Sequence, residues 1–273
     1  MRARLLQIIR SLGLSHRLDL LRYYWSRWRN RGENLDFRRS QPDFVLPPDY
    51  LMYESYKLDY AAYQRSGQEA AEWLKKTIRP FVEPETPAGS GLRILDWGCG
   101  PGRVVRHLPE VFGNHGQYYG CDPNERSITW CTAALPKIDF RPSGLMPPLD
   151  YPTGYFDVLY GISIFTHLSE AAHQAWIEEL ARILKAGGLA LLTTHGPIYE
   201  KKLTPNERDS YQEGILIVRG KVQEGHRVFT AFQPPAYWRE LLAPYFKVEY
   251  YQAGKAKSWG LEQDVWVMKK PED

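Results

Sequence analysis

Short apolar runs alternate with amphipathic stretches through most of the chain. Seven of these runs are typical of buried strands, and they lie at residues 93–96, 118–122, 138–140, 155–160, 189–194, 246–251 and 265–269. Between the earlier runs, apolar residues three or four positions apart predict helices, as at residues 124–134 and 170–184. Strands that alternate with helices predict an α/β fold built on a mostly parallel sheet.

The most informative stretch follows the first predicted strand, where residues 94–105 read Ile-Leu-Asp-Trp-Gly-Cys-Gly-Pro-Gly-Arg-Val-Val. Gly98, Gly100 and Gly102 alternate through a turn, and apolar residues then resume at helical spacing from Val104. A glycine turn between a strand and a helix brings backbone N–H groups and a helix N-terminus close to a ligand, with no side chains in the way. The stretch therefore predicts a cofactor site.

Two cofactors use such a turn, and the spacing of small residues distinguishes them. The dinucleotide fingerprint G-x-G-x-x-G/A needs a third small residue where this chain has Arg103 or Val105. The run from Asp96 to Gly102, Asp-x-Gly-x-Gly-x-Gly, instead resembles motif I of class I S-adenosylmethionine (SAM)-dependent methyltransferases. In that family, the acid that ends the first strand helps to orient the loop and the amino-acid end of SAM. An NAD-dependent oxidoreductase stays as the alternative.

A second acid, Asp122, ends the second predicted strand and lies 24 residues after Gly98 (122 − 98). An acid at this place can accept both ribose hydroxyls of a bound nucleoside. By itself it fits NAD as well as SAM, and it could also be a surface aspartate that caps the next helix. Together with the spacing of the glycine turn, it favours SAM.

Two further motifs extend the resemblance over about residues 92–195. Phe156-Asp157-Val158 is similar to the family's Phe-Asp-x-Val signature, and residues 184–188, Leu-Lys-Ala-Gly-Gly, match its turn before the fifth strand. The stretch 143–145 stands where the family cradles adenine, although the acid often found there is absent. The resemblance implies a Rossmann-like sheet of seven mostly parallel strands with helices on both faces, and SAM as the cofactor. The residues that it places around SAM are Asp96, Gly98, Cys99, Gly100, Gly102, Asp122, Pro123, Ser143, Gly144, Leu145, Gly161 and Ile162.

The first 39 residues are strongly basic. They hold ten Arg, no Lys and three acids, a charge of +7, so the rest of the chain carries −4 of the net +3. Apolar residues recur every three or four positions from Leu5 to Trp28, which predicts one or two amphipathic helices. Such a basic helix can lie on an anionic membrane surface, or it can pack on the domain or on a second subunit. Nucleic-acid binding agrees less well with the acidic remainder.

These patterns divide the chain into two predicted parts. Residues 1–48 are expected to be a basic helical arm that ends in a linker at 30–48, and residues 49–273 a SAM-binding methyltransferase domain. Five tyrosines at helical spacing predict a Tyr-rich lid helix within 49–80. An insertion is expected after the fifth strand, at 196–235, with a helix at 199–211 and a hairpin of 215–218 with 227–229. The lid tyrosines that could cover the substrate are Tyr53, Tyr56, Tyr60 and Tyr63, although packing of this helix on the sheet edge explains them equally well.

Two histidines follow strand ends and are candidate general bases. A hydroxyl acceptor benefits from a base with a pKa near neutral, which suits histidine. His195 is the first choice, because two threonines precede it and a glycine follows it, and His167 is the second. For each of them, a structural histidine that binds loop carbonyls is the alternative.

The acceptor is predicted by elimination. The chain has no His-Glu-x-x-His motif and no cysteine cluster, so no metal is expected. The Asp-Asp-Asn set of catechol-type enzymes, the Asn-Pro-Pro-Tyr motif of base methylation and the paired glutamates of arginine methyltransferases are absent too. We therefore expect methylation of oxygen on a sugar, a lipid-linked glycan or another small molecule. The chain as a whole also resembles uncharacterised family members from bacterial polysaccharide gene clusters, through its Tyr-rich lead-in and its Thr-His-Gly strand end. A non-catalytic protein of the same fold, recruited to a membrane or partner, stays as a further alternative.

The cysteines and the hydropathy bear on the compartment. Cys99, Cys121 and Cys131 form no Cys-x-x-Cys pair, which indicates buried thiols in a reducing compartment. An apolar run of ~18 residues is also missing, so no membrane-spanning helix is expected. The expected location is the cytoplasm, with peripheral contact at the inner face of the membrane as an option for residues 1–39.

Overall fold

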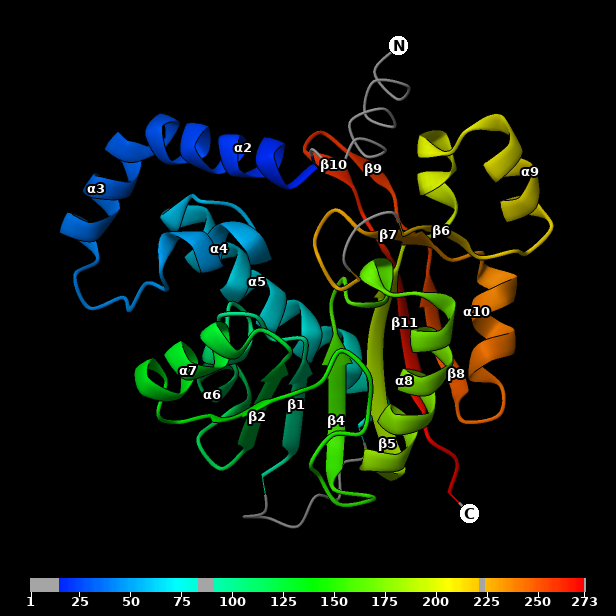
Figure 1. Cartoon of the computed structure of the whole chain (residues 1–273). Helices are drawn as coiled ribbons and strands as arrows, with labels where there is room; N and C mark the ends of the chain where they lie inside the picture. The colour runs from blue at the N-terminus through cyan, green and yellow to red at the C-terminus, as the bar shows by residue number, and fades with distance from the viewer. Residues whose placement is uncertain (1–14, 83–90, 221–223, 273) are drawn as a thin grey trace.

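The computed structural model describes residues 15–82, 91–220 and 224–272. Its centre is a seven-stranded sheet with the order β3-β2-β1-β4-β5-β11-β8 (Figure 1). The strands are β1 (Arg93–Trp97), β2 (Gln117–Asp122), β3 (Asp139–Pro142), β4 (Phe156–Gly161), β5 (Leu184–Thr194), β8 (Lys247–Gln252) and β11 (Asp264–Lys269). Neighbouring strands run parallel, except that β11 is antiparallel to both β5 and β8. The predicted seven-stranded, mostly parallel sheet is confirmed.

Helices pack on both faces of this sheet. The helices of the described residues, on the sheet or beyond its end, are α2 (Ser15–Arg29), α3 (Arg31–Ser40), α4 (Asp49–Ser55), α5 (Tyr60–Ile78), α6 (Leu108–Phe112), α7 (Glu125–Ala134), α8 (Glu170–Ile183), α9 (Pro205–Gln212) and α10 (Pro235–Leu242), with the 3-10 turns η1 (Arg79–Phe81), η2 (Val105–His107), η3 (Phe165–His167) and η4 (Pro197–Lys202). One apolar cluster joins α8 and α10 to the sheet, and a second joins α5, α6 and α7 to it. Ile94 and Leu95 are successive residues of β1 that belong to different clusters, because alternate strand residues point to opposite faces. None of the helices in the described ranges is long and apolar enough to cross a membrane.

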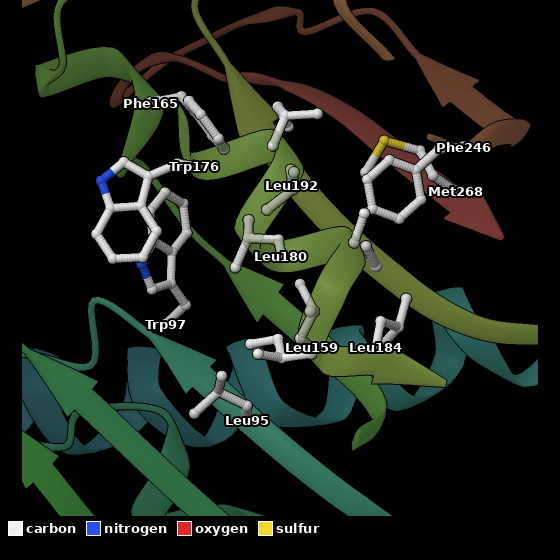
Figure 2. Close-up of a cluster of buried hydrophobic side chains, with 14 of the residues drawn as sticks. Leu95, Trp97, Leu159, Phe165, Trp176, Leu180, Leu184, Leu192, Phe246 and Met268 are labelled. Atoms are coloured by element: carbon white, nitrogen blue, oxygen red, sulfur yellow. The ribbon is translucent and has the colours of Figure 1, made fainter. Parts of the chain in front are cut away.

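The cluster under α8 holds the sheet at the end where the candidate site lies. In Figure 2, Trp97 from β1 and Trp176 from α8 lie side by side, and their ring centroids are 4.9 Å apart. Phe165 from η3 packs on Trp97 at 4.9 Å. Leu180 and Leu192 are fully buried in the same cluster, and each such side chain contributes about 1.5–3 kcal/mol to folding. The turns that follow β1 and β4 are therefore supported by a tightly packed apolar core.

The strand order reverses between β1 and β4. From β1 the chain builds outward to β2 and β3, and it then returns to the other side of β1 to add β4 and β5. The two loops that leave β1 and β4 therefore run in opposite directions and leave a crevice between them. In open α/β sheets, ligands bind in this crevice, outside the carboxyl ends of the strands.

The predicted linker at 30–48 is wrong over residues 31–40, which form α3. Its sequence is polar at most positions, and only Asn34 and Phe37 are buried, so the helical period was hard to recognise. The Asn34 side chain accepts a hydrogen bond from the N–H of Tyr60 at 3.0 Å, and Phe37 packs edge-on against Phe44. The part of the predicted arm that falls on residues 1–14 lies outside the described residues.

Two other predicted helices are each split by an N-cap. The Tyr-rich stretch forms α4 and α5, because the Asp59 side chain accepts the N–H of Ala62 and starts a new helix. The stretch 199–211 divides into η4 and α9, where Thr204 and Glu207 form a capping box. The inserted hairpin is present as β6 (Ile217–Arg219) and β7 (Thr230–Phe232), so its second strand starts three residues later than predicted. A separate small pair, β9 (Ala256–Lys257) and β10 (Gly260–Leu261), precedes β11.

Candidate active site

A cavity of about 620 Å³ opens at the carboxyl ends of β1, β2 and β4, which is where the strand order reverses. This volume is within the range of cofactor and ligand pockets. The cavity is lined by ten of the residues predicted around SAM, which are Asp96, Gly98, Cys99, Gly100, Asp122, Pro123, Ser143, Gly144, Leu145 and Ile162. Residues far apart in the sequence are thus gathered in one place, as the motif order predicted.

The glycine turn after β1 presents backbone, not side chains, to the cavity. Gly98, Gly100 and Gly102 have φ angles of +78°, +50° and +70°, a conformation that other residues rarely adopt. The N–H groups of Gly98 and Cys99 both donate to the carbonyl of Cys121 in β2, at 2.8 and 3.0 Å. The predicted helix after the turn starts as the 3-10 turn η2 and continues as α6. The turn is therefore fastened to β2 and leaves a cradle that a side chain would fill.

Gly102 and Gly161 do not line the cavity. A Cβ on Gly102 would lie 2.9 Å from Leu135, and one on Gly161 would lie 2.7 Å from the Trp97 ring. These glycines let α7 and Trp97 pack closely behind the site, so their expected place in contact with SAM is not supported.

Asp122 holds the glycine turn in place. Its Oδ2 accepts the N–H of Gly100 and its Oδ1 accepts the N–H of Asn124, each at 2.8 Å. Burial raises the pKa of this carboxyl, and the two N–H donors oppose that rise. A carboxylate oxygen can accept more than one hydrogen bond, so both oxygens can still accept a hydroxyl from the cavity side. The geometry is compatible with the predicted ribose contact.

Asp96 is buried at the tip of β1 and faces the same cavity. Burial raises the pKa of its carboxyl to about 7, with a further rise from Asp122, while Arg103 and the Tyr160 hydroxyl lower it. That hydroxyl lies near the carboxyl, but it is buried without hydrogen-bond geometry to any described residue. A cation in the cavity would compensate for the buried charge of Asp96, because an opposite charge nearby favours the ionised form.

The tip of β4 is a strained turn that sequence reasoning missed. Ser163 lines the cavity with φ of +66°, which is unusual for a residue with a side chain. Its N–H donates to the Thr193 hydroxyl at 2.8 Å, and its own hydroxyl accepts from the Gln263 amide at 2.8 Å. Thr193 in turn donates to Gln263 at 2.6 Å. Three polar residues from three segments therefore hold this turn. Because they lie far apart in the sequence, their hydrogen bonds could not be predicted from it.

The loop after β3 also lines the cavity. The N–H of Ser143 donates to the carbonyl of Asp122 at 3.1 Å, and the carbonyl of Leu145 accepts the indole N–H of Trp176 at 2.9 Å. Both contacts fix the backbone at the position that the family resemblance assigns to adenine. The adenine contact itself stays a prediction.

The two candidate bases have different surroundings. His167 lines the cavity, and its Nδ1 lies 2.7 Å from the carbonyl oxygen of Phe229. His195 does not line it: the ring stacks on Tyr199 at 4.0 Å, and its Nδ1 lies 3.0 Å from the carbonyl of Ala231. Burial lowers the pKa of His195 to about 3. The order of preference from the sequence is therefore reversed, because the Thr-His-Gly strand end directs His195 into the inserted segment.

The four predicted lid tyrosines do not line the cavity either. Tyr53, Tyr60 and Tyr63 are buried, and their hydroxyls donate to Asp19, Asp49 and the carbonyl of Pro101. The fourth ring, Tyr56, lies under the Arg103 guanidinium. Of the two Tyr-rich helices, only α4 reaches the cavity, through Leu51, Glu54 and Ser55.

A loop from the inserted segment forms the remaining wall. Arg227 lines the cavity and donates to the backbone carbonyl of Tyr53 at 2.6 Å. Glu224 accepts the N–H of Ser169 at 2.6 Å, and the N–H of Gly225 donates to the carbonyl of His167. This wall joins α4 to the segment before α8, and no sequence motif pointed to it. In the part of the chain that the structure describes, no group of three or more His, Cys, Asp or Glu residues could hold a metal ion.

Comparison with known proteins agrees with this geometry. Residues 94–188 match the family model described as a methyltransferase domain. A tRNA (carboxymethyluridine(34)-5-O)-methyltransferase from Arabidopsis thaliana is 32% identical over 129 residues, which are 47% of this chain and 29% of that protein. A ubiquinone biosynthesis O-methyltransferase from Bradyrhizobium sp. (strain ORS 278) is 32% identical over 110 residues, which are 38% of this chain and 40% of that protein. The chain thus spans less than half the length of either relative.

The solved structures agree on the fold. A SAM-dependent methyltransferase from Methanosarcina mazei superposes with a TM-score of 0.55 at 18% identity, over 72% of this chain and 98% of that one. Fold, domain match and motif order together define a class I methyltransferase architecture. Residues 94–188 are a methyltransferase domain on the fold of SAM-dependent methyltransferases, and the cofactor is SAM. The residues present fit that cofactor, because two acids on adjacent strand ends flank a turn with no side chains.

Proposed function

We propose that this chain transfers the methyl group of SAM to a hydroxyl oxygen of a small-molecule or glycan acceptor. The proposal is carried by one observation: Asp96 and Asp122 line a single cavity on either side of the glycine turn. SAM supplies a methyl group on a positively charged sulfur and leaves as the neutral thioether. The chain supplies position, the exclusion of water and a site for the acceptor's proton.

The tautomer of His167 supports its role as the base. A carbonyl oxygen can only accept a hydrogen bond, so Nδ1 must carry the proton that it shares with Phe229, and Nε2 keeps its lone pair. Burial lowers the pKa of this imidazole, with smaller contributions from Arg227 and His226. The ring is then neutral near pH 7 and able to take the hydroxyl proton at Nε2 as the oxygen–methyl bond forms.

The acceptor class is the least constrained part of the proposal. The two relatives are named for tRNA and for ubiquinone biosynthesis, so their names do not select one acceptor. The polar side chains of His167, Glu224 and Arg227 line the cavity, whereas Trp176 is only 2% exposed there. Polar side chains that converge on one cavity suit an acceptor with several hydroxyls, such as a sugar.

Calorimetric titration with SAM and with its demethylated product tests the cofactor. Wild type is expected to bind both, and Asp122→Ala to bind ten- to a hundredfold more weakly, because hydrogen bonds to a charged group are lost. Asp150→Ala is the matched control, since this carboxyl is fully exposed outside the cavity. Binding of NADH with no binding of SAM would favour the oxidoreductase alternative.

Transfer itself is tested with methyl-labelled SAM and a panel of sugars, glycans and other hydroxyl compounds. The expected product is a methyl ether, detected by mass spectrometry together with the demethylated cofactor. Label that appears only on carbon or nitrogen would contradict the choice of oxygen. SAM binding without transfer to any member of the panel would leave the non-catalytic alternative as the better one.

A further inference from the structure

Helix α2 exposes a continuous stripe of large apolar side chains. Leu21, Tyr24, Trp25 and Trp28 are 67%, 56%, 57% and 75% exposed. They occupy positions i, i+3, i+4 and i+7, so they lie along one face of the helix. Isolated exposed apolar residues are common on protein surfaces, but a stripe that includes two tryptophans is not.

This stripe is not the face by which α2 packs on the protein. The opposite face carries Asp19 and Tyr23, which are buried. The Tyr23 ring packs against Tyr50 and Tyr53, at centroid distances of 5.3 and 5.4 Å. The helix is thus held by one side and presents a second apolar side outward.

Arginines border the stripe on both sides. By helical spacing, Arg22 and Arg29 lie along one edge and Arg27 along the other. The Arg29 guanidinium lies over the Trp25 ring at 5.1 Å from its centroid. Within α2 and α3, residues 15–40, seven Arg face three acids, a balance of +4. The surface is therefore basic as well as apolar.

A hollow of about 470 Å³ between α2 and α3 adds to this charge. Three arginines line it, namely Arg27, Arg31 and Arg38, and Trp28 stands at its side. One carboxylate, Asp49, also lines it and pairs with Arg27 at 3.3 Å. The Arg38 guanidinium donates to the Tyr60 hydroxyl at 2.9 Å. Three guanidinium groups against one carboxylate leave an excess of positive charge, as an anionic headgroup would require.

We propose that α2 and α3 form a docking surface for an anionic lipid membrane, with the stripe at the headgroup boundary and the arginines on lipid phosphates. Tryptophan and tyrosine favour that boundary, and arginines beside them gain from anionic lipid. A nucleic acid would be bound by the arginines but would leave a stripe of this length in water. The positive charge of this surface is complementary to a layer of lipid phosphates. The apolar stripe also requires an apolar region, which in a membrane lies directly beneath the phosphates.

The docking surface is mechanically connected to the candidate active site. The Tyr53 hydroxyl donates to Asp19 of α2 at 2.9 Å, and its backbone carbonyl accepts from Arg227 in the cavity wall. Figure 1 shows α2 beyond the same end of the sheet as the carboxyl ends of the parallel strands. A docked molecule would therefore hold its cavity near the lipid surface, where an acceptor with a lipid anchor would be within reach.

Co-sedimentation of the full chain with vesicles tests the proposal. Vesicles of phosphatidylcholine are compared with vesicles of equal parts phosphatidylcholine and phosphatidylglycerol. Wild type is expected to bind only the second kind, and less when ionic strength rises from about 0.1 to 1 M, which shortens the screening length from about 10 to 3 Å. Trp28→Ser and the double variant Arg22→Glu/Arg29→Glu should each bind at least tenfold more weakly.

Matched controls separate this surface from general effects. Trp259→Ser removes an equally exposed tryptophan, 73% against 75%, from the hairpin before β11. Arg208→Glu reverses an exposed arginine on α9. Both controls should bind vesicles like wild type, and SAM calorimetry should show that every variant is folded.

Three results would overturn the proposal. The first is wild-type binding that does not distinguish the two kinds of vesicle. The second is an equal loss in the Trp28 and Trp259 variants. The third is a dimer, seen by sedimentation velocity, that Trp28→Ser dissociates while vesicle binding is unchanged, since the stripe would then be a subunit interface. SAM binding is measured separately, so failure here would leave the proposed function standing.

Discussion

Asp96 is buried, although its proposed contact with SAM needs a charge. Burial raises the pKa of its carboxyl to about 7, against an ordinary value of 3.8. Between these two values the folded chain keeps a proton that the unfolded chain has lost, so stability falls as pH rises across this window. The ammonium group of SAM would reverse the balance, because a cation favours the ionised carboxylate.

The first prediction follows from this pKa. In wild type, SAM should bind roughly tenfold more weakly at pH 6 than at pH 8. The reason is that SAM would bind the ionised form of Asp96, and at pH 6 this carboxyl must first lose its proton. Asp96→Asn should bind weakly at both values and lose the slope. The same variant should melt a few degrees higher than wild type at pH 8, since it removes a buried charge. Calorimetry across pH and thermal unfolding measure both effects, and a slope that persists in the variant would assign it to another group.

The second prediction concerns the two histidines, which form a matched pair. Each has its Nδ1 on a backbone carbonyl, but only His167 lines the cavity. His167→Asn keeps a donor for that carbonyl and should lower kcat by 10²- to 10⁴-fold, the usual contribution of a general base. His195→Asn should change kcat less than about twofold. SAM affinity should stay the same in both.

The pH profile checks the same assignment. The pKa of His167 is lowered, so wild-type kcat should hold constant down to below about pH 6.5, the ordinary value for histidine, and then fall as the ring is protonated. A full rate in His167→Asn would indicate that positioning alone drives transfer.

At the scale of elements, the glycine turn requires both its backbone conformation and its empty space. The third prediction separates these two requirements. Gly98→Ala places a Cβ at φ +78° and 2.2 Å from the Ile164 side chain, whereas Gly154→Ala places one at φ +65° in open space. Both variants should lose about 1–2 kcal/mol of stability from the left-handed conformation. Only Gly98→Ala should also lose SAM affinity, because only its Cβ enters the cavity wall. Denaturant unfolding and calorimetry measure the two effects, and equal affinities would contradict a backbone cradle.

The same elements explain how far the sequence could be interpreted. The strand ends with Asp96 and Asp122 were predictable, because a buried strand, a carboxylate and a glycine turn are local patterns. The wall made by Glu224 and Arg227 was not, since its contacts join residues as far apart as Tyr53 and Arg227. The helix α3, which the sequence did not predict, shows the same limit. Its buried residues contact distant partners: Asn34 contacts Tyr60 of α5, and Phe37 contacts Phe44 in the loop that follows α3.

At the scale of the whole molecule, one tyrosine joins the N-terminal helices to the cavity wall that holds Arg227. The Tyr53 hydroxyl donates to the side chain of Asp19 at 2.9 Å and also lies 3.1 Å from its carbonyl. Asp19 is only 4% exposed, so its carboxylate depends on this donor. The cavity contact of Tyr53 uses its backbone carbonyl instead, and a change of the side chain leaves that contact in place.

The last prediction uses that separation. Tyr53→Phe should cost about 1–3 kcal/mol, because it leaves the buried Asp19 oxygens without their donor. The loss should be local: amides of α2 should exchange with solvent faster, amides of β1 and β4 should stay protected, and SAM affinity should change less than twofold. Tyr24→Phe is the control, since that ring is exposed on the opposite side of α2. Hydrogen exchange followed by mass spectrometry measures the pattern. Equal acceleration in α2 and β1 would contradict this, because the N-terminal helices and the sheet would then open as one cooperative unit. The stability of the docking surface on α2 and α3 could then not change independently of the stability of the sheet.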